Sequence, residues 1–153
     1  MHKGDNMKLR KAVMDDAELI LKWRNDEKTR ENSFSSDVIA LDDHIKWLSR
    51  KLEDPKCHLY MLEDDGEAVG NIRLDILDND DVGEISYMIA PDKRGQGYGK
   101  AILSLVEDKA REHGIKTLTG LVKDENVASK KCFEKAGYAC ASGGTIAAYI
   151  KPM

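Results

Sequence analysis

The chain has 153 residues, 41% of them hydrophobic and 34% charged, which predicts a single domain over residues 1–153 with one substantial core. Its net charge of -4 argues against a general nucleic-acid-binding protein, because such proteins carry an excess of Lys and Arg on one face. No run of residues has the length of a membrane span, and the N-terminus lacks the apolar segment of a signal peptide. We therefore expect a cytoplasmic protein with neither a membrane nor a nucleic-acid partner. The three cysteines lack C-x-x-C spacing, which favours reduced thiols and no metal site: Cys57, Cys132 and Cys140.

The N-terminal third predicts one strand and two helices. Residues 1–6 are polar and are expected to form a disordered extension, and residues 8–13 are expected to form the first strand. Apolar residues at helical spacing predict a helix over 17–23, after two aspartates that suit a helix start. Residues 27–40 are polar and predict a loop that can contain a helical turn. Apolar residues at i, i+4, i+7 and i+11 predict an amphipathic helix over 41–52, with a proline just beyond it.

The middle of the chain predicts three antiparallel strands in succession. The strands cover 57–63, 68–76 and 82–89, joined by turns that are rich in Asp, Asn and Gly. The second strand alternates an apolar face with a polar one, and its polar face carries Asn71, Arg73 and Asp75.

The last third alternates helices and strands. A helix over 100–113 leads to a strand over 117–122, which should run parallel to strand 82–89 because a helical crossover connects them. A helix over 126–136 and two strands, 138–140 and 145–150, complete a mixed α/β fold with about four helices.

A glycine-rich stretch separates strand 82–89 from the helix that follows it. Three glycines at alternate positions leave the backbone N–H groups free to point into a common space, and the helix N-terminus adds its unpaired amides. Such a turn binds phosphate oxygens. The G-x-G-x-x-G dinucleotide fingerprint fails because its last position holds Lys100, and the mononucleotide P-loop fails because Ala101 replaces its Ser or Thr.

This stretch, Arg94-x-x-Gly97-x-Gly99 after an Ala-Pro turn, resembles the acyl-CoA pyrophosphate loop of the GNAT N-acetyltransferases. The order of strands and helices is similar to that family, and the helix Asn126 to Tyr138 resembles its C-terminal helix. The resemblance implies a central, mostly antiparallel twisted sheet with one splayed parallel strand pair. It also implies acetyl-CoA as the co-substrate, no metal, and direct transfer of the acetyl group to a primary amine.

The resemblance also implies which residues hold the cofactor. Main-chain groups of the strand before the loop would pair with pantetheine, the loop amides would bind pyrophosphate, and residues of the last helix would contact the pantetheine arm. Asn126 is also expected as a plain helix N-cap. The expected cofactor-binding residues are Met88, Ile89, Ala90, Arg94, Gly95, Gln96, Gly97, Tyr98, Gly99, Lys100, Asn126 and Phe133.

Two catalytic residues are expected. Glu84 alternates with Ser86 and Met88 and would face the cleft as the general base, or else stand as a solvated carboxylate at the strand start. The family often places a Tyr on the last helix to protonate the departing thiolate, and this sequence has Phe133 there. The proton would then come from water or from another donor such as Ser129.

The N-terminal half resembles a narrower group that acetylates nucleotide-linked amino sugars, as in the pseudaminic acid pathway. The similarity lies in a Trp-Arg-Asn helix end and a His-x-x-Trp helix. Arginines there could bind a pyrophosphate, and tryptophans could stack on a sugar or uracil, although core packing is the favoured role of each tryptophan taken singly. The expected substrate residues are Trp23, Arg24, Asn25, Arg30, His44 and Trp47.

Two alternatives stay open at this stage. One is an N-terminal acetyltransferase of peptides or ribosomal proteins, and the other is a module that binds acyl-CoA without turnover. The expected partner is a small amine acceptor, with a sugar nucleotide preferred, and the protein is expected to be a monomer or a homodimer.

Overall fold

A computed structural model describes residues 6–34, 37–79 and 81–153. Most of the predicted N-terminal extension, residues 1–5, lies outside these ranges, as do two residues of the loop over 27–40 and one of the turn before strand 82–89. No helix in the described ranges is long and apolar enough to cross a membrane.

Within these ranges the strands form one seven-stranded sheet in the order β1-β2-β3-β4-β5-β7-β6. Neighbouring strands are antiparallel except β4 and β5, which run parallel as predicted. The strands are β1 (Met7–Lys11), β2 (Cys57–Asp64), β3 (Glu67–Ile76), β4 (Val82–Ile89), β5 (Thr117–Lys123), β6 (Ala139–Ser142) and β7 (Ile146–Pro152).

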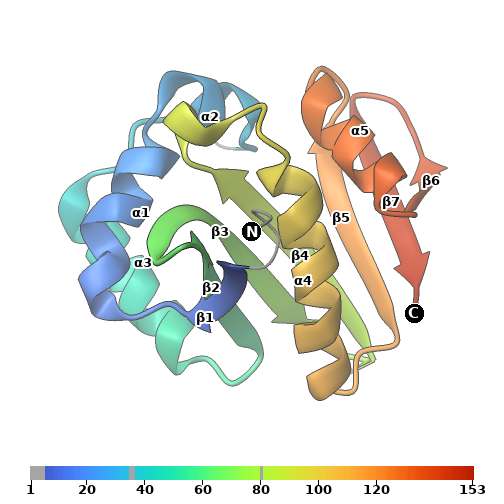
Figure 1. Cartoon of the computed structure of the whole chain (residues 1–153), viewed down its shortest axis with the longest axis horizontal. Coiled ribbons are helices and arrows are strands. Elements are labelled where there is room, and N and C mark those ends of the chain that lie inside the picture. The colour runs from blue at the N-terminus through green and yellow to red at the C-terminus, as the bar shows by residue number, and fades with distance from the viewer. Residues whose placement is uncertain (1–5, 35–36, 80) are drawn as a thin grey trace.

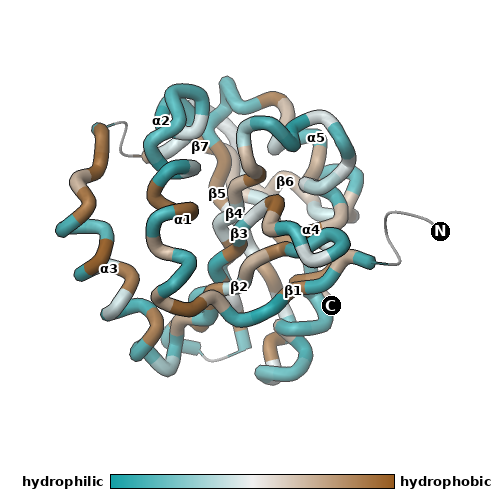
Figure 2. The backbone as a smooth tube through the Cα atoms, turned by 60° about the vertical axis from the view of Figure 1, so that its left-hand side comes forward, coloured by the Kyte–Doolittle hydropathy of each residue, from teal (hydrophilic) through white to brown (hydrophobic). Residues whose placement is uncertain are grey.

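Helices cover both faces of the sheet. Figure 2 shows α1 and α3 on one side of the strands and α4 and α5 on the other. The helices are α1 (Ala17–Arg24), α2 (Glu27–Asn32), α3 (Leu41–Glu53), α4 (Tyr98–Glu112) and α5 (Val127–Lys135), with 3-10 turns at Met14–Asp16 and Pro91–Lys93.

The helix α2 lies within residues 27–40, where the sequence predicts a loop that can contain a helical turn. Its sequence, EKTREN, has no apolar stripe, so helical periodicity gives no signal. The helix forms because Asp26 caps it: the Asp26 carboxylate accepts a hydrogen bond from the Thr29 backbone N–H at 3.1 Å.

The core lies in two apolar clusters, one on each face of the sheet. Successive residues of β2 alternate between them: Leu59 and Met61 join the cluster under α1 and α3, and Tyr60 and Leu62 join the cluster under α4 and α5. We call these the α1/α3 face and the α4/α5 face.

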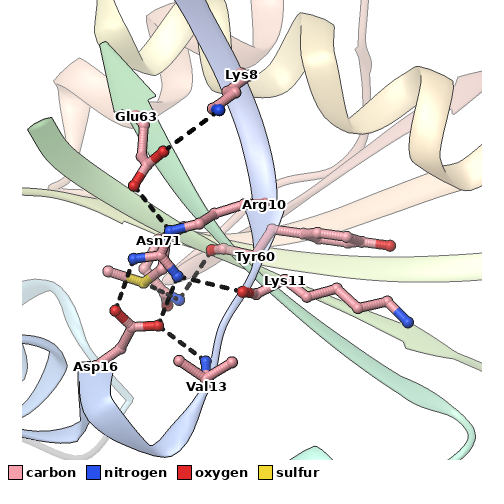
Figure 3. Close-up of polar contacts among 9 residues, drawn as sticks. Lys8, Arg10, Lys11, Val13, Asp16, Tyr60, Glu63 and Asn71 are labelled. Atoms are coloured by element: carbon pink, nitrogen blue, oxygen red, sulfur yellow. Dashed lines mark hydrogen bonds and ion pairs between the residues drawn. The ribbon is translucent and has the colours of Figure 1, made fainter. Parts of the chain in front are cut away.

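An ion-pair network fixes the start of α1 against the sheet (Figure 3). Two nitrogens of Arg10 donate to the Asp16 carboxylate, each at 2.8 Å, and a third donates to Glu63 at 2.8 Å. Asp16 also accepts the Val13 backbone N–H at 2.8 Å. The Arg10 hydrogen bonds are the main reason why the pKa of Asp16 lies below its usual value. The network holds α1 in place, and α1 ends at Arg24.

The parallel pair β4–β5 separates part-way along its length. Backbone pairing runs from Val82 with Thr117 to Ile85 with Gly120 and ends there. The remaining four residues of β4, 86–89, pair with β3 alone among the described strands. Figure 1 shows β4 and β5 diverging toward the end of the sheet where α2 and α5 lie. The splayed strand pair is therefore confirmed.

Candidate functional site

The space between the separated strands opens into a cavity of about 780 Å³. Five successive residues of β4, 85–89, line it, so the cavity reaches both faces of the sheet. Its other walls come from the ends of α1 and α2, the first turn of α4, and α5. The volume is that of a site for a small organic ligand.

The glycine loop forms one end of this cavity. Gly95 and Gly97 have positive φ angles of 76° and 88°, and α4 begins directly afterwards, two residues earlier than predicted. Within the described hydrogen bonds, the backbone N–H groups of Gly97, Gly99 and Lys100 have no acceptor. These amides are therefore available to an anion at the N-terminus of α4.

Side chains beside the loop hold it in place. Arg94 donates to the Asp26 carboxylate at 2.6 Å and to the Thr29 hydroxyl at 2.8 Å, which ties the loop to α2. The Tyr98 hydroxyl donates to the Asp64 carboxylate at 2.6 Å, which ties it to the β2–β3 hairpin. This hydrogen bond raises the pKa of Tyr98 to about 12, so the phenol stays protonated.

Most of the expected cofactor-binding residues line the cavity, and two do not. Ala90 is buried, and its N–H donates to the Val69 carbonyl, so it serves the sheet. The exposed Gln96 side chain turns back to the Asp92 carbonyl. The expected residues that line the cavity are Met88, Ile89, Arg94, Gly95, Gly97, Tyr98, Gly99, Lys100, Asn126 and Phe133.

The helix α5 contributes a cap and an aromatic ring. Asn126 accepts the Ser129 backbone N–H at 3.2 Å, so the N-cap expectation is confirmed, while its side chain also lines the cavity. The tip of the Phe133 ring lies against β5, where a Cβ on Gly120 would stand 2.5 Å from the Cζ atom. Phe133 also stacks on Tyr149, with ring centroids 5.4 Å apart. The glycine at 120 is thus required for the ring to approach the sheet.

Tyr87, which lies at the separation of the strands, is not among the residues expected from the sequence. Its hydroxyl is 3.1 Å from the hydroxyl of Ser129, and both residues line the cavity, together with Cys132. Burial raises the pKa of Tyr87 far above its ordinary value. The sequence could have indicated this residue, because a tyrosine, and not a phenylalanine, occupies an inward position of the strand before the loop.

Glu84 lies on the predicted face but outside the cavity. The register pairs it with Asp75 across β3, on the same face as Ser86 and Met88. Glu84 is not among the residues that line the cavity, and its role as the general base stays a prediction. The described lining residues include no Asp, Glu or His.

Cationic and aromatic side chains line the end of the cavity on the α1/α3 face, which we call the acceptor end. The Arg24 guanidinium carbon lies 4.2 Å from the centre of the Trp47 ring, and that of Arg73 lies 5.8 Å from the same ring. Arg73 is paired with Asp75 at 2.9 Å. Arg24 makes no ion pair with any described carboxylate. Burial and the nearby Arg73 lower its pKa.

His44 holds Arg24 in this position. Its Nε2 lies 2.8 Å from the Ala17 carbonyl, which can only accept, so Nε2 carries the proton and Nδ1 accepts from Arg24 at 2.9 Å. Burial lowers the pKa of His44, and the positive charge of Arg24 lowers it further. The imidazole is therefore neutral at physiological pH.

Of the six expected substrate residues, only Arg24 and Trp47 line the cavity. Trp23 is 3% exposed and packs in the core, which was the favoured alternative. Asn25 bonds the Ile39 backbone through both ends of its amide, and Arg30 donates to the Asn25 carbonyl. These side chains serve the fold around the acceptor end and do not line the cavity.

A profile of the acetyltransferase (GNAT) family matches residues 17–138, which include the acceptor end, the strand separation and the glycine loop. The chain belongs to this family. It is an N-acetyltransferase that uses acetyl-CoA. No curated protein sequence matches the chain significantly.

Solved structures of other proteins share the fold over nearly the whole chain. The spermidine N-acetyltransferase from Vibrio cholerae, solved with CoA and spermine, has a TM-score of 0.88 at 16% identity, covering 97% of this chain and 96% of its own. The aminoglycoside acetyltransferase AAC(6')-Ib, solved with paromomycin and acetyl-CoA, has a TM-score of 0.85 at 18% identity, covering 97% and 94%. A domain from Methanocaldococcus jannaschii has a TM-score of 0.84 at 21% identity, covering 96% and 98%. At such identities the likeness concerns the fold.

The residues of this GNAT chain fit acetyl-CoA. The open amides of Gly97, Gly99 and Lys100 suit a pyrophosphate. Even-numbered residues of β4, Met88 among them, direct their main chain to β3, so the edge left unpaired after Ile85 offers the main chain of Tyr87 and Ile89 to an extended amide-bearing arm such as pantetheine. The thioester supplies an activated acetyl group, and this chain's own residues orient it and admit the amine.

Proposed function

We propose that this acetyltransferase transfers the acetyl group of acetyl-CoA directly to the primary amine of a small acceptor that also carries an anionic group, and that this acceptor is a nucleotide-linked amino sugar. The observation that carries the proposal is the charge of the acceptor end. Arg24 and Arg73 flank Trp47 there, Lys28 lines the cavity from α2, and no described lining residue is acidic.

Polycationic acceptors fit this charge poorly. Spermine and paromomycin, which are present in the structures of two relatives, carry several ammonium groups. Ammonium groups close to Arg24 and Lys28 would repel them, and the described lining offers no carboxylate in return. Phosphate oxygens, in contrast, would form charge-assisted hydrogen bonds with Arg24, which has no carboxylate partner among the described residues.

The aromatic surface supports a sugar or a base in the same place. The Trp47 ring lies under the Arg24 guanidinium and lines the cavity. The Arg24 fork suits a diphosphate, and the part of the Trp47 indole that lines the cavity beside Arg24 and His44 gives the attached sugar or base an apolar contact.

The same cations favour the reactive form of the amine. Acyl transfer needs a neutral amine, and neighbouring positive charges lower the pKa of an ammonium group. Arg24, Arg73 and Lys28 would therefore help an acceptor amine to lose its proton without a carboxylate in the lining. We infer that water in the cavity takes this proton, with Glu84 as the candidate base behind it.

The experiment is a free-thiol release assay with acetyl-CoA and four acceptors at equal concentration: a UDP-linked 4-amino sugar, a set of N-terminal peptides, spermidine and paromomycin. We expect thiol release, and a mass gain of one acetyl group, with the sugar nucleotide. Release with peptides alone would overturn the acceptor in favour of protein N-terminal acetylation. Release with spermidine or paromomycin alone would overturn the argument from charge.

A further inference from the structure

The side chain of Arg94 connects the glycine loop to α2. One of its guanidinium nitrogens lies 2.6 Å from the Asp26 carboxylate and 2.8 Å from the Thr29 hydroxyl. The hydrogen bond from Arg94 is the main reason why the pKa of Asp26 lies below its usual value, so the carboxylate is ionised at neutral pH. The charge of Arg94 is therefore paired within the protein itself.

The helix α2 has little apolar packing to hold it in place. None of its six residues, all of which the structure describes, is buried. Its sequence, EKTREN, offers no large apolar side chain to either core cluster. A helix of this length is also unstable in isolation. The position of α2 therefore depends on polar contacts.

These contacts lie at both ends of α2. At its start, the Asp26 carboxylate accepts the Thr29 backbone N–H at 3.1 Å and also binds Arg94. At its end, the Lys123 ammonium of β5 donates to the Glu31 carbonyl at 3.0 Å. The helix is thus attached to the glycine loop and to β5, at the end of the sheet where β4 and β5 diverge (Figure 1).

The same helix forms part of the cavity wall. Lys28, Thr29 and Asn32 line the cavity from α2, and Phe34 lines it just beyond the helix. Lys28 supplies part of the positive charge of the acceptor end. A shift of α2 would move this charge and change the shape of the wall that an acceptor meets.

The glycine loop can bind pyrophosphate without the Arg94 side chain. The backbone N–H groups of Gly97, Gly99 and Lys100 have no acceptor within the described hydrogen bonds and lie at the N-terminus of α4. A guanidinium that is paired with a carboxylate attracts a further anion only weakly, because the two opposite charges largely cancel. The Asp26 carboxylate has this effect on Arg94.

We propose that Arg94 is a positioning residue for the acceptor end: its side chain reaches from the cofactor loop and fixes α2 as a wall of the cavity. The loop binds the cofactor through its backbone amides, and the Arg94 side chain serves the acceptor. This inference rests on the proposed function, which places the acceptor beside Lys28.

The first test measures acetyl-CoA affinity by calorimetry and needs no acceptor. Arg94→Gln should keep the Kd for acetyl-CoA within about twofold, because the amides remain and the lost charge was already paired. Asp26→Ser keeps an N-cap side chain but leaves Arg94 unpaired, so it should not weaken acetyl-CoA binding. A roughly tenfold weaker binding to Arg94→Gln, as expected for a lost charged contact, would assign the side chain to the cofactor and overturn the proposal.

The second test measures the position of α2 directly, by amide hydrogen exchange read out by NMR. The Thr29 and Arg30 amides should exchange about fivefold faster in Arg94→Gln, the factor that corresponds to one typical intramolecular hydrogen bond. Lys93→Gln is the matched control, because it removes a cation of the same segment that is paired with Glu67 and not with α2. Unchanged exchange in Arg94→Gln, or equal acceleration in Lys93→Gln, would overturn the proposal.

The third test measures the KM for the acceptor. Arg94→Gln and Asp26→Ser should each raise it about fivefold, and the double variant should raise it little further, because the two residues act as one pair. Lys123→Met should raise it as well, although Lys123 belongs to β5 and not to the loop. An acceptor KM that Arg94→Gln leaves unchanged would overturn the proposal. If the sugar nucleotide is not acetylated, the proposed function fails while the first two tests still decide the role of Arg94, and the third uses whichever of the four acceptors reacts.

Discussion

Replacing Arg24 by Gln tests whether the enzyme recognises its acceptor through a negative charge. Arg24 has no carboxylate partner among the described residues and is held over Trp47 by His44, so its charge is free to meet an anion of the acceptor. A hydrogen bond to a charged group contributes about 1.5–3 kcal/mol, which corresponds to roughly tenfold to 150-fold in affinity. We expect Arg24→Gln to raise the KM for the UDP-linked 4-amino sugar by that factor, with the KM for acetyl-CoA changed less than twofold.

The assay follows thiol release against acceptor concentration at low and moderate salt. Arg24→Lys should recover part of the loss, because it keeps the charge without the planar fork. Arg111→Gln, an exposed position on α4, is the matched control. If Arg24→Gln lowered kcat/KM equally for the sugar nucleotide and for the same amino sugar without its nucleotide, Arg24 would have a structural role and the charge argument would be refuted.

Three further predictions concern the loop, the base and acid stability. Gly97→Leu should weaken acetyl-CoA binding measured by calorimetry. It should also lower the free energy of unfolding by about 1–2 kcal/mol, because Gly97 has a left-handed φ of 88°. Unchanged affinity for acetyl-CoA would contradict the loop assignment. Glu84→Gln should lower kcat at neutral pH by a larger factor than it lowers the affinity for acetyl-CoA. The loss of kcat should be well under the ~100-fold expected for a direct base, because Glu84 acts through water. Full activity of the variant at every pH would exclude Glu84 as the base. Because the pKa of His44 is lowered in the folded protein, this side chain binds a proton more readily in the unfolded chain. The free energy of unfolding is therefore unaffected by His44 above pH ~6.5 and falls as the pH is lowered below that value. A Gln at position 44 can keep both hydrogen bonds of His44 without titrating, so His44→Gln should reduce the fall of Tm between about pH 6.5 and 5. The remaining fall would come from His58, whose pKa is also lowered by burial. An unchanged slope of Tm against pH would exclude His44 as its source.

The sheet could be predicted because its signals are local. Alternating side chains marked β2, β3 and β4, a helical crossover required β5 to be parallel to β4, and the glycines marked the anion-binding turn. These features depend on residues close together in the sequence, so periodicity and spacing were enough.

The direction of individual side chains could not be predicted in the same way. Trp23 and Arg24 are neighbours on α1, yet one is buried in the core and the other lines the cavity, because the packing of α1 on the sheet decides which side of the helix faces inward. The helix α2 depends on a single cap at Asp26 and on the long-range contact with Arg94. Glu84 lies on the expected face, but the cavity begins only where the strands separate, after Ile85. That point is set by the pairing of two strands distant in sequence.

The most direct test of the account is the ratio of kcat/KM for a UDP-linked 4-amino sugar to that for the same amino sugar without the nucleotide diphosphate. Two charge-assisted contacts at the acceptor end, each of about 1.5–3 kcal/mol, predict a ratio of at least ~100 in favour of the nucleotide-linked form. A ratio near one, or faster acetylation of spermidine than of either sugar, would contradict an acceptor recognised through its negative charge.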